Sequence, residues 1–329
     1  MNAARLQVRV ARRSTQGEGI CALELESIDG EPLPAFSPGS HIDLFVDAGL
    51  VRQYSLCNAP TASDRYEIAV LRDVHSRGGS RTVHERIREG DVLTISQPRN
   101  HFALVEGARR SVLLAGGIGV TPLLSMVERL SQQRASFELH YCVRSLAHVA
   151  FADRLAEPRL AGCVHLHADD AGAAQKLDVA AALGAPDAQA HAYVCGPGGF
   201  IDWVMQCARE HGWQADHLHC ERFSAPAERQ ARINDSETIT DRPFDLVLAR
   251  TGRIVHVSGQ QSAAQALIEA GIDLPLSCEQ GVCGTCLTPV LDGEIDHRDL
   301  LLTDAERALG RQFTPCCSRA RSARLVIDL

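Results

Sequence analysis

The stretch Cys278-Glu279-Gln280-Gly281-Val282-Cys283-Gly284-Thr285-Cys286 places three cysteines at the spacing Cys-x4-Cys-x2-Cys, and the pair Cys316-Cys317 follows near the C-terminal end. This spacing is typical of the thiolate ligands of a plant-type [2Fe–2S] cluster, in which each of the two irons needs two protein sulfurs. One loop must therefore curl around the cluster and supply three of the four ligands. Gly281 and Gly284 favour such a bend, because glycine reaches positive φ angles without steric cost. We expect backbone N–H groups of this loop to point at the sulfurs and to help set the reduction potential of the cluster.

Two other interpretations of these cysteines are weaker. A structural zinc site usually takes two short pairs, each spaced Cys-x2-Cys, whereas the first gap here is four residues. Three unrelated thiols in one loop are a third interpretation, but the spacing is among the more specific cysteine patterns. The fourth ligand is either Cys316 or Cys317, and spacing alone does not choose between them.

Length and composition exclude several classes of protein. At 329 residues the chain is long enough for two or three domains. Its net charge of −8 argues against nucleic acid or an anionic membrane as the main partner. No apolar run approaches the length of a membrane span, and the start at Met1 lacks the apolar core of a signal peptide.

Twelve cysteines are too few for a disulfide scaffold of this length. We expect those outside the cluster to be reduced and mostly buried thiols, as in a cytoplasmic protein. They are Cys21, Cys57, Cys142, Cys163, Cys195, Cys207, Cys220 and one of Cys316 and Cys317.

Residues 1–106 predict a small antiparallel β-barrel, because short alternating segments are separated by glycine and proline turns. The predicted strands include 6–10, 21–26, 41–46 and 66–71, with one helix over 82–87.

Two motifs in this region indicate a phosphorylated flat cofactor. Arg52-Gln53-Tyr54-Ser55-Leu56 offers a cation, an aromatic ring and a hydroxyl on one strand, with Arg52 and Tyr54 on the same face. Arg77-Gly78-Gly79-Ser80 begins a helix, whose first N–H groups can bind a phosphate. Each motif has a plain alternative: a solvated arginine on an edge strand, or a glycine turn with Ser80 as a helix N-cap. Together they favour the cofactor.

From Ser111 the pattern changes to that of a doubly wound α/β domain. The apolar run 112–115 predicts a buried parallel strand, and Gly116-Gly117-Ile118-Gly119-Val120-Thr121-Pro122 opens a helix over 123–130. A strand, a glycine-rich turn and a helix form the unit that binds a dinucleotide pyrophosphate, although the strict G-x-G-x-x-G pattern is absent. A second such turn, Gly196-Pro197, follows the predicted strand ending at Cys195, where this fold places its ligand.

The strand predicted over 164–167 bears on the choice of nucleotide and on metal binding. Asp169 and Asp170 follow it and would repel a 2′-phosphate, so we expect NADH rather than NADPH. Arg144 at the end of the preceding strand argues the other way. The histidine pairs 165/167 and 217/219 resemble metal ligands, but we explain them by strand alternation, because no third ligand stands near them in the sequence.

The remaining chain contains a linker and a small C-terminal domain. Residues 225–241 are polar and aperiodic, which is typical of an exposed linker. A hairpin is predicted over 244–248 and 253–257, a helix capped by Ser262 over 262–270, and a last strand over 324–329. The cluster loop lies between that helix and that strand.

Across essentially all 329 residues, these motifs in this order resemble the phthalate dioxygenase reductase family, which also includes vanillate demethylase and carnitine monooxygenase reductases. The resemblance implies a β-barrel flavin domain (1–106), a doubly wound NAD-binding domain (107–227), a linker (228–241) and a β-grasp plant-type ferredoxin domain (242–329). In this family the last cluster cysteine lies two residues before a Ser-Arg pair, which selects Cys316 together with Cys278, Cys283 and Cys286.

The resemblance also implies the cofactors and the residues that hold them. FMN would be held by Arg52, Tyr54, Ser55, Gly78, Gly79 and Ser80, with Phe223 at the flavin ring. NADH would meet Gly116, Gly117, Gly119, Thr121, Asp170, Cys195, Gly196 and Pro197, with Thr121 and Cys195 bordering the nicotinamide.

The implied activity is that of an oxygenase reductase. NADH gives two electrons to the flavin, which passes them singly to the cluster, while the protein supplies placement and electrostatics; no side chain is predicted to be catalytic. The partner would be a terminal Rieske non-haem iron oxygenase acting on an aromatic acid or similar small substrate, and the reductase is expected to be a monomer. A stand-alone electron carrier or redox sensor is disfavoured by the nucleotide turns, and a flavin-only reductase is disfavoured by the cluster loop.

Overall fold

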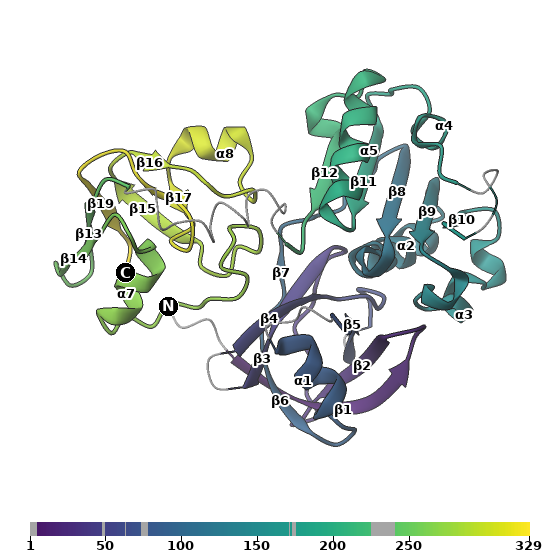
Figure 1. Cartoon of the computed structure of the whole chain (residues 1–329). Coiled ribbons are helices and arrows are strands. Elements are labelled where there is room, and N and C mark those ends of the chain that lie inside the picture. Colours follow the sequence, from purple (N-terminus) through teal and green to yellow (C-terminus); the bar gives the residue numbers. More distant parts are fainter. Residues whose placement is uncertain are drawn as a thin grey trace. The chain divides into compact units, whose positions relative to one another are not determined.

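The computed structural model describes residues 5–47, 50–62, 64–73, 78–170, 172, 176–224 and 241–329. It divides into two compact units, Met1–Arg222 and Phe223–Leu329, and each is described by itself (Figure 1). Arg77 of the predicted phosphate motif and nearly all of the predicted linker, residues 228–240, lie outside the described residues.

The first unit begins with a strongly curved antiparallel sheet in the order β4-β3-β6-β1-β2-β5, with β7 paired to β3. Alternating residues such as Val8 and Val10 point into its core. A bridge between Leu56, just after β4, and Ile68 on β5 joins the two ends of the sheet, so the barrel is nearly closed. The strands are β1 (Arg5–Thr15), β2 (Ile20–Ser27), β3 (Ser40–Asp47), β4 (Leu50–Ser55), β5 (Arg65–Leu71), β6 (Val92–Ser96) and β7 (Arg99–Asn100).

One helix, α1 (Gly79–Glu85), packs on the barrel. It begins three residues before the predicted start at Thr82, because Gly78 takes a left-handed conformation (φ 105°) and turns the chain directly into the helix. No side chain caps this helix, so the alternative with Ser80 as N-cap is wrong.

A five-stranded parallel sheet in the order β10-β9-β8-β11-β12 completes the first unit. After β8 the chain adds strands on one side and then returns to β11 on the other, so the order reverses between β8 and β11 (Figure 1). Ligands of doubly wound sheets bind at the carboxyl ends of strands beside such a reversal. The strands are β8 (Arg110–Gly116), β9 (Phe137–Val143), β10 (Val164–Ala168), β11 (Ala190–Cys195) and β12 (Leu218–Glu221).

Helices cover both faces of this sheet, and their cores confirm the predicted buried strands. Leu113 and Tyr193 pack with α2 on one face, while Val112 and Val194 pack with α5 on the other. The first of these cores continues into barrel residues such as Ile20, so the barrel and the parallel sheet share one hydrophobic cluster. The helices are η1 (Gly117–Gly119), α2 (Val120–Gln132), η2 (Leu146–His148), α3 (Ala152–Leu155), η3 (Pro158–Leu160), α4 (Val179–Leu183), α5 (Gly198–Glu210) and η5 (Ala215–His217), of which those labelled η are 3₁₀ helices.

The second unit contains a mixed sheet in the order β14-β13-β19-β15-β17 and a small pair, β16-β18. The predicted cap is confirmed: the Ser262 side chain accepts from the N–H of Gln265, whose side chain accepts from the N–H of Ser262. The elements are β13 (Phe244–Leu248), β14 (Ile254–Val257), α7 (Ala263–Glu269), β15 (Thr288–Asp292), β16 (Ile295–Asp296), α8 (Asp304–Leu309), β17 (Gln312–Phe313), β18 (Arg319–Ala320) and β19 (Arg324–Ile327). Among the described residues of the whole chain, no helix is both long enough and apolar enough to cross a bilayer.

Candidate cofactor and electron-transfer site

The cysteine loop of the second unit brings four thiols together as two pairs. Cys278 hydrogen-bonds with Cys283, and Cys316 hydrogen-bonds with Cys286. Cys316 also lies close enough to Cys278 for their charges to interact, which links the two pairs. Two pairs of sulfurs match the requirement that each of two irons takes two protein ligands. The four residues therefore fit a [2Fe–2S] cluster.

Backbone N–H groups in this loop point at the sulfurs, as the sequence predicted. Gln280 N–H donates to Cys278 Sγ at 3.3 Å, and Val282 N–H also donates to Cys278. Gly281 N–H donates to Cys316. The hydrogen bond from Cys283, with these N–H donors, lowers the pKa of Cys278 to about 7, while the same hydrogen bond and burial raise the pKa of Cys283. Donors directed at sulfur favour the thiolate form that iron requires.

Both glycines of the loop are needed for this shape. Gly281 and Gly284 have positive φ angles, 71° and 73°. A Cβ on Gly281 would lie 2.4 Å from Cys317 Sγ and 3.0 Å from the Cα of Asp299, so no larger residue fits. Asp299, itself buried, accepts from the N–H of Leu302 at 2.8 Å and so fixes the segment against which the loop packs.

Cys316 and Cys317 are adjacent in sequence but have different surroundings. Cys317 Sγ lies 3.2 Å from Thr314 Oγ1 and packs against the backbone of Gly281. The thiol of Cys317 interacts with the neighbouring thiol of Cys316. The thiol of Cys316 also interacts with those of Cys278 and Cys286. These surroundings support Cys316 as the fourth ligand.

In the first unit, Arg52 on β4 lies against the start of α1. A Cβ on Gly79 would lie 2.5 Å from Arg52 Cγ and 2.8 Å from its Nε, so the absence of a side chain at Gly79 lets the arginine cross the helix start. A guanidinium beside backbone N–H groups at a helix start is a suitable donor set for phosphate. The Arg52, Gly78 and Gly79 positions thus fit the phosphate end of a flavin mononucleotide.

Three other predicted flavin residues, Tyr54, Ser55 and Ser80, lie on these two elements. Burial raises the pKa of Tyr54, on the same strand, so its hydroxyl stays protonated and its ring packs partly against the barrel core. Ser55 ends this strand. Ser80 lies within α1, and its hydroxyl accepts from the N–H of Asp73 at 3.2 Å. Phe223 begins the second unit with 43% of its surface exposed, and its role at the flavin ring stays a prediction.

The two glycine turns meet at the carboxyl ends of β8 and β11. A Cβ on Gly119 would lie 2.3 Å from the Cys195 carbonyl oxygen, and one on Gly196 would lie 2.9 Å from the Cα of Gly116. Only glycine permits this approach of backbone to backbone. Gly117 also has a positive φ angle of 52°. Glycine turns of this kind at the ends of parallel strands suit a pyrophosphate, because its oxygens can accept from their backbone N–H groups.

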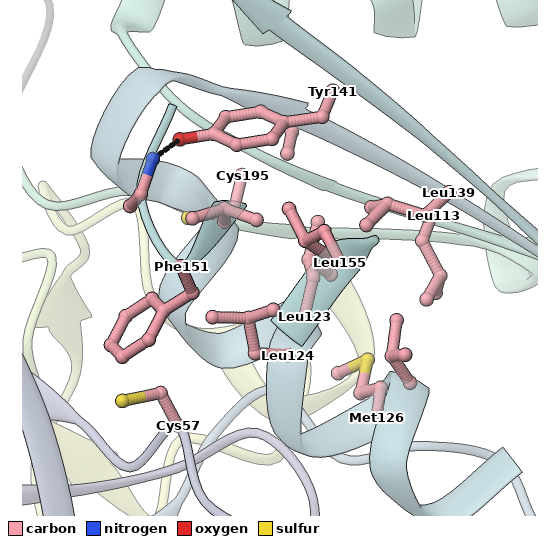
Figure 2. Packing of buried hydrophobic residues seen from close by; sticks show 14 of the residues in the cluster. Cys57, Leu113, Leu123, Leu124, Met126, Leu139, Tyr141, Phe151, Leu155 and Cys195 are labelled. Carbon is pink, nitrogen blue, oxygen red and sulfur yellow. Dashed lines mark hydrogen bonds between the residues drawn. The ribbon is translucent and has the colours of Figure 1, made fainter. Parts of the chain in front are cut away.

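Three further predicted residues lie within or next to the two glycine turns. Thr121 is buried and donates its hydroxyl to the Ile118 carbonyl at 3.0 Å, which holds the first glycine turn in shape. Cys195 is fully buried, and Figure 2 shows it within the same apolar cluster as Tyr141 and Leu123. Burial raises the pKa of its thiol, which therefore stays neutral. Pro197 is the N-cap residue of α5. Asp170 is exposed after β10, and its N–H donates to the Arg144 carbonyl at 3.3 Å.

One functional candidate was missed from the sequence. Glu221 ends β12, and its carboxyl accepts from Ser55 Oγ at 3.3 Å and lies 4.0 Å from His41 Nδ1. Its side chain is 13% exposed, and burial raises the pKa of Glu221 to about 8. His41 is buried as well, and its pKa is lowered by burial and by Arg99. The sequence did place a carboxylate, Glu221, at the end of a parallel strand, where α/β sheets bind ligands. Its partner Ser55 could not be identified from the sequence, because it is 166 positions away.

We expect Glu221 to make the stability of the first unit depend on pH. The folded carboxyl keeps its proton up to a pKa of about 8, whereas an unfolded glutamate loses its proton near pH 4.3. Between these values the folded state binds more protons, so the free energy of unfolding falls as pH rises, by at most about 1.4 kcal/mol per pH unit. The uncharged variant Glu221→Gln should lack this fall when urea midpoints are followed by flavin fluorescence from pH 5 to 8.

The matched control is Glu31→Gln, which removes an exposed carboxylate from the same unit. It should keep the wild-type dependence on pH. Parallel pH profiles for wild type and Glu221→Gln would show that Glu221 is ionised in the folded protein and would contradict the prediction.

One cysteine outside the cysteine loop departs from the burial expected for most of these thiols. Cys220 on β12 is exposed rather than buried, because alternate side chains of this edge strand face away from the core. The other thiols outside the cysteine loop are buried or half-buried.

Comparison with known proteins gives the following matches. Residues 246–321 match the family described as 2Fe-2S iron-sulfur cluster binding domain, and residues 94–218 match the one described as dimethylamine monooxygenase subunit DmmA-like, N-terminal domain. The chain is 47% identical over 324 residues to a vanillate O-demethylase oxidoreductase of Pseudomonas sp. (strain HR199 / DSM 7063), covering 98% of this chain and 100% of the relative. It is 38% identical over 327 residues to the carnitine monooxygenase reductase subunit of Escherichia coli (strain K12), covering 98% of each. Among solved structures, phthalate dioxygenase reductase matches with a TM-score of 0.71 at 35% identity, over 99% of this chain and 98% of that chain.

Proposed function

Since the chain belongs to the phthalate dioxygenase reductase family, we propose that its first unit holds FMN and binds NADH through the residues described above, and that Cys278, Cys283, Cys286 and Cys316 hold its [2Fe–2S] cluster. The chain is the reductase component of an oxygenase system and an oxidoreductase that uses FMN, NADH and a [2Fe–2S] cluster. FMN held there would supply the conversion between the two-electron chemistry of NADH and the one-electron chemistry of the cluster.

The cluster assignment rests on one observation. Four thiols lie together in two pairs, and backbone N–H groups donate to Cys278 and Cys316. A structural zinc site would be served by any four thiolates, but pairing of two and two with N–H donors to sulfur suits a cluster whose charge changes during function. A stand-alone carrier would need neither the glycine turns at β8 and β11 nor the Arg52 and Gly79 contact.

The residues of the first unit act by binding and orientation. Arg52 supplies a fixed cation for the phosphate of FMN, and the Gly79 position lets backbone donors approach the same group. The turns containing Gly119 and Gly196 offer N–H groups to the NADH pyrophosphate. Ser55 and Glu221 form a buried, proton-holding pair between the barrel and the parallel sheet.

The finer assignments are proposals of the same kind. We propose a terminal Rieske non-haem iron oxygenase as the partner, one that acts on an aromatic acid or a similar small substrate. The support is that the relatives include a vanillate O-demethylase oxidoreductase and a phthalate 4,5-dioxygenase reductase subunit. The domain boundaries proposed are 1–106, 107–227 and 242–329, joined by a linker at 228–241. We propose a monomeric protein of the cytoplasm, a compartment that keeps buried thiols such as those of Cys57 and Cys195 reduced.

Reduction of cytochrome c by NADH tests this function, because cytochrome c accepts one electron at a time. We expect steady NADH-dependent reduction by the protein loaded with FMN and cluster, and turnover of vanillate when a purified vanillate-demethylating Rieske oxygenase is added. Failure to reduce cytochrome c would contradict the function. Reduction of cytochrome c without oxygenase turnover would contradict only the proposed class of partner.

Nucleotide preference is a separate prediction. Asp169 and Asp170 are exposed beside the end of β10, where they would repel the 2′-phosphate of NADPH. We expect wild type to have a higher kcat/KM for NADH, and Asp170→Asn to reduce the preference about fivefold, since one charge pair at ~4 Å in water is worth about 1 kcal/mol. The control Asp153→Asn, at an exposed position on α3, should change nothing. Equal kcat/KM values for the two nucleotides in wild type would overturn this.

A further inference from the structure

In the folded chain, side chains of β9 lie beside His165 and His167 of β10, although they are distant in the sequence. On β10, His165 stands directly opposite His140 of β9. Glu138 precedes His140 by two positions on β9 and therefore lies on the same face. This face is opposite the one on which Leu139 and Tyr141 enter the hydrophobic core. Glu138 and His140 therefore stand near His165 as further possible ligands, contrary to the expectation that no third ligand does. The predicted strand that contains His165 and His167 is confirmed.

His140 is held with one ring nitrogen unsatisfied. Its side chain is only 10% exposed, and its Nδ1 lies 3.2 Å from His167 Nε2. Its Nε2 makes no well-aligned hydrogen bond within the described residues and lies 3.5 Å from Glu138 Oε2. A proton on His140 Nε2 or a metal ion bound to both atoms can bridge this contact with Glu138 Oε2.

Glu138 is also held in place. Arg110 Nη2 donates to Glu138 Oε1 at 3.2 Å, while the same guanidinium donates to the carbonyls of Ala182 and Leu183 at 2.9 and 2.8 Å. One carboxylate oxygen is therefore bound to Arg110, and Oε2 is the one that faces His140. The positive charge of Arg110 lies beside Glu138 and His140 and weakens the binding of a cation there. Arg110 also fixes the Glu138 carboxylate in the orientation that a metal ligand needs.

We propose that Glu138, His140 and His165 bind a divalent transition metal ion, with zinc as the best match. One ligand atom from each residue lies within 4.8 Å of the others. Two ligands of a tetrahedral zinc ion lie about 3.3–3.5 Å apart, since each is about 2.0–2.2 Å from the metal. The Glu138 and His140 atoms already have this separation. The His165 ring, stacked on His140 with centroids 4.8 Å apart, must turn out of the stack to complete the set.

The chemistry of the three donors selects the metal. The two imidazoles are borderline ligands, which favour zinc over magnesium or calcium, and zinc also accepts a carboxylate oxygen. The same set also suits ferrous iron, but zinc lies higher in the order of affinities for divalent metals. Glu138 and His165 are half-buried, so water can take the fourth position. His167 stands behind His140 as the partner that orients its ring.

A second histidine group on the same sheet provides the comparison. His191 Nδ1 lies 3.0 Å from His219 Nε2, and the His191 and His217 rings stack 4.7 Å apart. His217 Nδ1 is already bonded to the Ala190 carbonyl at 2.9 Å. Within the described part of the chain, this group does not bring three ligand atoms within 4.8 Å of one another, whereas Glu138, His140 and His165 do. Proximity of imidazoles alone therefore does not define the proposed site.

Isothermal titration of ZnCl₂ into the FMN- and cluster-loaded protein, after passage over a metal-chelating resin, tests the proposal. Free thiols can also bind zinc, so the result is the difference between variants. We expect wild type to bind one more equivalent of zinc than His165→Ala does. Glu138→Gln should bind that additional zinc at least ~10-fold more weakly than wild type. His219→Ala should bind zinc as wild type does. Zinc should also raise the thermal midpoint of wild type and of His219→Ala, but not of His165→Ala.

The variants distinguish loss of the site from loss of the fold. Glu138→Gln keeps the size of the side chain and removes only its charge, and flavin content reports whether each variant is folded. If His165→Ala does not retain flavin, Glu138→Gln decides alone. The proposal would be overturned if wild type and Glu138→Gln bound zinc with equal stoichiometry and affinity. Loss of the additional zinc equivalent in His219→Ala would overturn it as well.

Discussion

Cys316→Ser should lose the [2Fe–2S] cluster, with iron content falling from two atoms per chain to about none and the electron paramagnetic resonance signal of the reduced protein disappearing. Cys316 is the thiol that contacts Cys286 and lies near Cys278, so its removal leaves one of the two sulfur pairs incomplete. Serine offers a hydroxyl of high pKa in place of a thiolate. NADH-dependent reduction of cytochrome c should fall with the cluster.

Cys317→Ser is the matched control, because it makes the same chemical change at the adjacent residue. Cys317 packs against Gly281 and Thr314, and serine is small enough for this space. We expect this variant to keep both iron atoms and its resonance signal. Retention of the cluster by Cys316→Ser, with loss in Cys317→Ser, would reverse the ligand assignment. FMN content should be normal in both variants, since Arg52, Gly78 and Gly79, which are proposed to hold the FMN phosphate, belong to the first unit.

Arg52→Ala should release FMN. The guanidinium crosses Gly79 at the start of α1, where it can donate two charge-assisted hydrogen bonds to a phosphate. Hydrogen bonds to charged groups contribute about 1.5–3 kcal/mol, so the dissociation constant for FMN should rise about 10- to 150-fold. Flavin fluorescence during titration of the apoprotein measures the change. The cluster should remain, because its ligands lie in the second unit.

The control for this variant is Arg65→Ala, which removes an exposed arginine of β5 that forms ion pairs with Glu24 and Asp64. It should bind FMN as wild type does, since surface ion pairs contribute little. Full flavin occupancy in Arg52→Ala at low FMN concentration would refute the role of Arg52. Loss of flavin from both variants would point to general destabilisation of the barrel instead.

Local sequence patterns were sufficient for many of the elements and for the bend of the cluster loop. The alternation in 66–71 predicted β5, and the apolar run at 112–115 predicted β8, because the period of the side chains reports which faces are buried. The Ser262 cap and the positive φ angles of Gly281 and Gly284 depend on atoms within a few residues. The start of α1 was misplaced because the left-handed conformation of Gly78 is not visible as periodicity.

The contacts that select individual functional residues depend on tertiary structure. Ser55 and Glu221 come from different sheets, and burial between those sheets is what holds a proton on the glutamate. Cys316 differs from Cys317 only through the loop that packs against them.

The sequence by itself determined the ligand types, the strands and the order of the domains, because these follow from spacing and from the period of hydrophobic residues. Strand pairing decided which distant side chains meet. Glu138 and His165 are 27 positions apart, and the register that sets His140 opposite His165 brings them within reach of one metal ion. A shift of one residue in that register would move the histidines to the other face of the sheet.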